Sequence, residues 1–108
     1  MGRYIVHAGC SINAEYYPVI GDLKEVENWA YQTALEEFDS YAGLHGLMDF
    51  EEYCGDMFYA IDFDEEAAWE DFCDYREGEL IYCVKPFDET NEYHIEYLNW
   101  NKGEFIEV

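Results

Sequence analysis

Apolar and polar positions recur along the chain with two different periods, one typical of helices and one typical of strands. Between residues 22 and 43, apolar side chains recur every three or four positions. Asp22 and Glu25 have the spacing of a helix N-terminus, and Gly43 follows the last apolar position. The pattern therefore predicts an amphipathic helix between Asp22 and Gly43.

The same start spacing occurs at two later points in the chain. Asp49 and Glu52 begin a shorter helical stretch, and Asp62 and Glu65 begin a longer one, which we expect to end at Gly78. The apolar side of this longer helix is predicted to comprise Phe63, Ala67, Ala68, Trp69, Phe72, Cys73 and Arg76.

Strand-like sequence lies at both ends of the chain. Residues 3–8, 79–85, 92–100 and 104–108 are rich in branched and aromatic residues or alternate with period two. The segment through Gly9, Pro18 and Gly21 predicts a loop. The predicted fold is α+β: a small antiparallel sheet, made of an N-terminal strand and a C-terminal meander, with two or three helices packed on one face.

Length and composition predict that residues 1–108 form a single folded domain. The chain has 108 residues and no internal repeat or low-complexity linker. Half of its residues are hydrophobic and 19% are aromatic, which distinguishes it from a disordered acidic tail.

Charge is the most unusual property of the sequence. There are 26 acidic and five basic residues, which gives a formal net charge of -21. A compact chain of this mass exposes roughly 6,300 Å², so an even distribution gives about one net charge per 300 Å². Such a charge costs stability through self-repulsion and exceeds what solubility requires. The acids are concentrated between Asp62 and Glu79, where half of the residues are Asp or Glu.

Spacing along the predicted helices arranges these acids into stripes. Glu66, Glu70, Asp74 and Glu77 fall on one helix face with about 6 Å between neighbours, a pitch that resembles successive backbone phosphates. The predicted partner-binding residues on the two helices are Glu36, Glu37, Asp39, Asp64, Glu65, Glu66, Glu70, Asp71, Asp74 and Glu77.

A purely solvated helix face is the alternative interpretation of these stripes. Solvated helices intersperse Lys or Arg at i+4, where opposite charges stabilise and like charges destabilise. Here nearly all the pairs are alike, and Asp74 and Glu77 lie near the helix end where the dipole disfavours carboxylates. Fold stability does not explain the pattern, which favours a functional acidic surface.

The sequence offers no motif for catalysis, a cofactor or a metal. The acids of residues 62–66 lack the glycine and closing glutamate of a calcium loop. The histidines His7, His45 and His94 have no specific ligand spacing with any cysteine, and no nucleophile or phosphate-binding motif is present. We therefore expect no enzyme activity, no cofactor and no metal site.

The cysteines and the N-terminus predict a cytoplasmic protein. Cys10, Cys54, Cys73 and Cys83 are widely spaced, and we expect reduced thiols, with Cys73 and Cys83 in the core. The N-terminus lacks the apolar stretch of a signal peptide, and no run is long enough to span a membrane.

These observations lead to the hypothesis of a non-enzymatic DNA mimic in a bacterial host cell. Its acidic surface, bordered by some of the chain's 11 tyrosines, would occupy the basic channel of a nucleic-acid-binding protein such as a Cas effector, a restriction enzyme or another nuclease. In size, acidity and aromatic content the chain resembles the anti-restriction and anti-CRISPR inhibitors of phages and mobile elements. Direct nucleic-acid binding is disfavoured by charge repulsion, no membrane partner is expected, and a homodimer is left open.

Two other classes remain as alternatives. An immunity or antitoxin protein that plugs a cationic nuclease would use the same acids over a smaller epitope. A domain adapted to high salt would carry a generally acidic surface of other function, and it should unfold in low-salt buffer.

Overall fold

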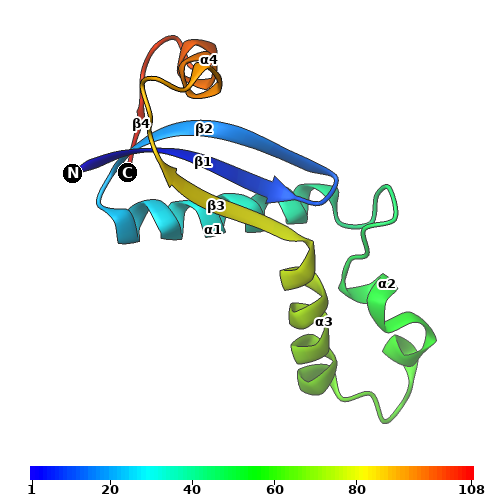
Figure 1. The fold of residues 1–108 in the computed structure, drawn as a ribbon. Helices are drawn as coiled ribbons and strands as arrows, with labels where there is room; N and C mark the ends of the chain where they lie inside the picture. Colours follow the sequence, from blue (N-terminus) through cyan, green and yellow to red (C-terminus); the bar gives the residue numbers. More distant parts are fainter.

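The computed structural model describes residues 1–108 as a four-stranded sheet with helices around it (Figure 1). The strands are β1 (Gly2–Cys10), β2 (Asn13–Gly21), β3 (Leu80–Pro86) and β4 (Ile106–Glu107), in the order β3-β1-β2-β4. β1 is antiparallel to both of its neighbours, whereas β4 is parallel to β2. The predicted α+β class is confirmed, and the N-terminal strand lies in the centre of the sheet.

One face of the sheet is covered by α1 (Leu23–Tyr41) (Figure 1). Because side chains alternate between the faces of a strand, Val6 and Ala8 of β1 point to the same side. Both are fully buried against Val26 and Ala30 of the helix. The predicted N-cap Asp22 is confirmed, although its side chain makes no capping hydrogen bond.

The chain between α1 and β3 forms a helical arm, defined here as residues 44–79, that projects from one end of the sheet (Figure 1). It comprises α2 (Phe50–Cys54), the short 3₁₀ helix η1 (Gly55–Tyr59) and α3 (Glu65–Glu79). As predicted, Asp49 caps α2, and its carboxylate accepts a hydrogen bond from the Glu52 N–H (2.8 Å).

The predicted bounds of α3 are wrong at both ends. Its N-cap is Asp64, whose carboxylate accepts a hydrogen bond from the Ala67 N–H (3.2 Å), so the start at Asp62 is two residues early. Gly78 does not end the helix, because the chain passes directly from Glu79 into β3 and no left-handed residue is needed to reverse it.

Two elements differ from the sequence prediction. The expected loop before α1 is strand β2, which forms a hairpin with β1 in which Cys10 opposes Asn13. Pro18 is tolerated in β2 because its missing N–H falls on the outer edge of the strand. The expected strand at residues 92–100 is helix α4 (Glu92–Trp100), whose N-cap Asn91 accepts hydrogen bonds from the N–H groups of Tyr93 and His94.

The predicted C-terminal meander is therefore wrong. Instead, the chain leaves β3, forms α4 and returns as β4 beside β2. α4 contacts β2 and lies on the opposite side of the sheet from α1 (Figure 1). Ring stacking of Tyr97 on Tyr16 joins α4 to the sheet, with the ring centroids 4.4 Å apart.

The arm makes the molecule elongated. Its principal extents are 58 × 27 × 17 Å, and its radius of gyration of 17.2 Å exceeds the roughly 13 Å expected for a compact chain of this length. A second small core of Cys10, Phe38, Leu47 and Phe72 joins the arm to the end of α1. The exposed area is consequently large, at 7212 Å².

Candidate protein-binding surface

The acidic ladder of α3, defined here as Glu66, Glu70, Asp74 and Glu77, lies on the exposed side of the helix. Phe72, on the other side of the helix, is the only buried residue of α3. At 100° per residue, the four ladder residues all lie more than a quarter turn away from Phe72. The predicted ladder is therefore directed to solvent, and the adjoining Asp64, Glu65 and Asp71 are also exposed.

The one basic residue of α3 does not neutralise this ladder. The guanidinium carbon of Arg76 lies 5.6 Å from the centre of the Trp69 ring, a cation–π geometry. The Arg76 Nη2 also donates to the Cys73 Sγ at 3.7 Å. Trp69, predicted to point inward, is 45% exposed while it contacts Phe50 and Phe72.

Glu77 has a structural role in addition to its place in the ladder. Its carboxylate accepts hydrogen bonds from the hydroxyl of Tyr31 on α1 (3.3 Å) and from that of Tyr82 on β3. The hydrogen bond to Glu77 is the main cause that raises the pKa of Tyr82. Glu77 thus ties the end of α3 to the sheet and its covering helix, and it is less available to a partner than the other ladder residues.

The three predicted acids of α1 are divided between two environments. Glu36 and Asp39 are exposed. Glu37 is half-buried and its Oε1 accepts a hydrogen bond from the Asn13 Nδ2 (2.6 Å), so it faces the start of β2. Glu36 and Asp39 are therefore accessible to a partner, whereas Glu37 belongs to the contact between α1 and the β1–β2 hairpin.

Tyr17 lies next to this contact, and its ionisation should be visible in alkaline unfolding. Burial, followed by the charge and hydrogen bond of Glu15 and the charge of Glu37, raises the pKa of Tyr17 to about 12 from 10.0. Because the folded state holds the Tyr17 proton more tightly than the unfolded state, the folded state keeps its full stability below pH 10. The free energy of unfolding then falls as the pH rises from 10 toward 12. Tyr17→Phe should flatten the fall in the free energy of unfolding over this window, measured by urea titration. A slope unchanged from the wild type would contradict the assignment.

The acidic stripes of α1 and α3 do not form two parallel rows. α3 projects away from the sheet, whereas α1 runs along the sheet (Figure 1). The two helices contact each other where Phe38 meets Phe72 and Tyr75 and where the Tyr31 hydroxyl donates to Glu77. The remaining ladder residues, Glu66, Glu70 and Asp74, therefore form a surface of their own on the arm.

The arm also exposes apolar side chains that the sequence analysis did not select. Met57, Tyr59 and Ile61 are 63%, 75% and 107% exposed, respectively, at the end of the arm. Met57 also lines a cavity of about 330 Å³, together with Tyr53, Cys54, Phe63 and Ala68. Asp62, Asp64 and Asp71 also line this cavity. The sequence did contain a sign of this exposure, because a run of large apolar residues lies between the helix starts at Asp49 and Asp62. So many apolar side chains are more than a core of this size can bury.

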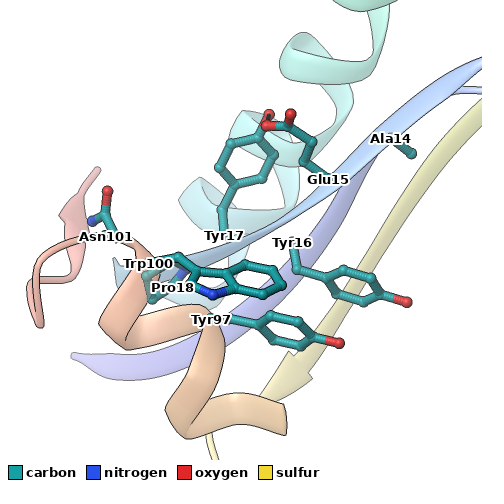
Figure 2. Close-up of a pocket in the computed structure, with 8 residues that line it drawn as sticks. All are labelled: Ala14, Glu15, Tyr16, Tyr17, Pro18, Tyr97, Trp100 and Asn101. Atoms are coloured by element: carbon teal, nitrogen blue, oxygen red, sulfur yellow. Dashed lines mark hydrogen bonds between the residues drawn. The ribbon is translucent and has the colours of Figure 1, made fainter.

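A second cavity lies at the opposite end of the molecule, between β2 and α4. It has a volume of about 380 Å³ and is lined by Ala14, Glu15, Tyr16, Tyr17, Pro18, Tyr97, Trp100 and Asn101. Figure 2 shows the rings of Tyr16, Tyr97 and Trp100 on one side of β2, with Glu15 and Tyr17 on the other. The stack continues across the sheet, because the His7 ring lies parallel to Tyr16 at 4.1 Å.

The thiols and imidazoles do not assemble into a metal site. No group of three or more His, Cys, Asp or Glu side chains has the geometry to hold a metal ion. All four cysteines are free thiols, and Cys10 is buried. Cys83 is exposed on β3, which corrects its predicted place in the core, because the face of β3 that carries it is not covered by α1.

No helix is both long enough and apolar enough to cross a membrane. Comparison with protein-family profiles, with curated proteins and with solved structures gave no match to this chain.

Proposed function

We propose that the protein is a non-enzymatic inhibitor that mimics DNA and binds in the basic nucleic-acid channel of a target protein. The targets that fit this chemistry are bacterial defence proteins, such as a Cas effector or a restriction enzyme, and other nucleases. Within a bacterial host cell, this activity would make it an anti-defence protein of a phage or mobile element.

The observation that carries this proposal is the linear charge density of the α3 ladder. From Glu66 to Glu77 the helix rises about 16 Å, and four carboxylates lie along that length. One strand of duplex DNA carries one phosphate per roughly 3.4 Å of axis, or about five over the same distance. A channel built for a phosphate strand therefore meets a similar charge density on α3.

The local density matters because the protein as a whole is less charged than DNA. Spreading 21 net charges over 7212 Å² gives about one per 340 Å², several-fold less than the surface density of a duplex. The arm combines the α3 ladder with a single basic residue, Arg76, which is directed to Trp69 instead of the ladder. Steering of a basic partner should act mainly through the arm.

Exposed apolar residues at the end of the arm can supply binding energy that does not depend on charge. Interfaces owe most of their binding energy to a few buried apolar or aromatic anchors. Tyr59 and Ile61 are large and exposed, and they precede α3 by only a few residues in the chain. We expect the partner to bury them, which gives the complex a component of affinity that salt does not screen.

A second candidate is an immunity or antitoxin protein that plugs a single cationic nuclease. The arrangement of the two stripes favours it, because α3 projects away from the sheet while α1 runs along it, and a compact epitope fits α3 alone. Losses of binding confined to α3 on charge reversal would support the plug, whereas losses at both Glu36 and the α3 ladder would support the extended mimic.

Capture from a bacterial lysate tests the proposed function. The immobilised protein should retain a nucleic-acid-binding protein at low salt and release it as the salt concentration rises. Free duplex DNA should displace the captured protein, whereas poly-glutamate at equal charge should displace it poorly. If no nucleic-acid-binding protein is retained, or if duplex DNA fails to compete, the proposal is wrong.

A further inference from the structure

The outer edge of β2 is open over the first half of the strand, from Asn13 to Tyr17. β4 pairs with the second half of β2, where Val19 opposes Ile106 and the Val108 N–H donates to the Ile20 carbonyl oxygen (3.1 Å). Backbone groups of alternate strand residues point to the same edge, so those of Ala14, Tyr16 and Pro18 point the same way as those of Ile20. Pro18 is fully buried beside β4, so the free edge offers the N–H and carbonyl groups of Ala14 and Tyr16.

Side chains of opposite character lie on the two sides of this edge. On the α4 side, Tyr16 and Trp100 line the cavity of about 380 Å³ that runs along β2 (Figure 2). On the α1 side, Glu15 lies beside the edge, and Glu37 is near enough to contribute to the raised pKa of Tyr17. A strand added here would have an aromatic surface against one face and carboxylates against the other.

We propose that the open edge of β2 binds an extended segment of a partner protein as an added strand, in which apolar residues alternate with Lys or Arg. Successive side chains of a strand point to opposite faces, so such a segment places its apolar residues on Trp100 and its cations beside Glu15. Hydrogen bonds between the two backbones supply the affinity, and the alternation of apolar and cationic side chains supplies the specificity. This surface is separate from the α3 ladder, and the inference does not depend on the proposed function.

A second copy of the chain fits the edge poorly. The unpaired part of this edge, from Asn13 to Tyr17, carries Glu15 and no cation, so pairing two copies brings like charges together. A net charge of -21 on each copy adds repulsion over a longer range. A cationic segment has neither disadvantage.

Amide hydrogen exchange measured by NMR tests this binding mode on the whole protein. The probe is a short capped peptide of strictly alternating lysine and valine, and its control has the same composition with all lysines before all valines. With the alternating peptide, exchange at Ala14 and Tyr16 should slow by about tenfold or more. Exchange at Glu15 and Tyr17, whose N–H groups face β1, should not change. Absence of slowing, or equal slowing by the control peptide, would overturn the proposal.

Two matched substitutions on α4 separate a specific site from general attraction to an acidic protein. Trp100 and Tyr93 are 68% and 67% exposed, so neither truncation should disturb the fold. Trp100→Ala should weaken binding of the alternating peptide by about tenfold, whereas Tyr93→Ala should leave it unchanged. Equal losses would overturn the proposal. So would protection of Ala14 and Tyr16 that rises with protein concentration when no peptide is present, because a second copy would then occupy the edge.

Discussion

Phe72→Ala should lower the free energy of unfolding by about 3–5 kcal/mol, the largest stability effect that we expect from one substitution. Phe72 is 4% exposed and is the only buried residue of α3. It packs with Phe38 of α1 and Phe50 of α2, at ring-centre distances of 6.0 and 5.6 Å. Truncation removes the side chain that joins these three helices and leaves a cavity that so small a core cannot close.

The loss should be concentrated in the arm. The sheet and α1 have a separate core that includes Val6, Val19 and Val26, and Phe72 takes no part in it. Amide exchange should therefore accelerate more in α3 than in β1, and urea unfolding should give the total loss. Phe72→Leu, which keeps most of the volume, should cost only about 1 kcal/mol. Equal acceleration in α3 and β1 would show that the two cores unfold as one unit.

The elements that could be predicted from the sequence are those whose local pattern agrees with their tertiary environment. Between Asp22 and Gly43 the apolar positions of α1 coincide with the side that packs on the sheet, with Val26 and Ala30 both buried. The strands β1 and β3 are likewise rich in branched and aromatic residues and were predicted within a few residues.

The elements that were missed depend on contacts distant in sequence. β2 contains Pro18 and ends at Gly21, both typical of loops, and it becomes a strand because β1 pairs with it along its whole length. Residues 92–100 alternate like a strand, yet Asn91 caps a helix and Tyr97 stacks on Tyr16 of the sheet. In each case a tertiary partner outweighs a weak local preference.

The candidate surface could be predicted only in part for the same reason. Helical spacing was sufficient to align Glu66, Glu70 and Asp74, because an alignment along one helix is a local property. The relation between α1 and α3, the turn of Glu37 toward Asn13 and the exposure of Ile61 all depend on how the arm leaves the sheet. No periodicity within a single segment contains that information.

The triple variant Glu66→Gln, Glu70→Gln, Asp74→Asn should slow association with a basic target by about tenfold or more at low salt. These three exposed carboxylates form the part of the ladder that makes no hydrogen bond to another element, unlike Glu77. Their removal lowers the local field that attracts the partner. Stopped-flow mixing with the captured target, repeated at increasing salt, gives the association rate and its salt dependence.

The matched control carries the same change in charge elsewhere. Glu89→Gln, Glu96→Gln, Glu104→Gln also removes three exposed carboxylates, but from the region around α4. It should slow association only slightly, because screened charges act over about 10 Å at 0.1 M salt.

The ladder variant should also be slightly more stable, by a few tenths of a kcal/mol for each like-charged i,i+4 pair removed, because Glu66, Glu70 and Asp74 repel one another. A variant that folds better and binds more slowly would separate the function of the ladder from any role in the fold. Equal slowing by both triple variants would instead attribute association to net charge alone, and the ladder would then have no specific part in it.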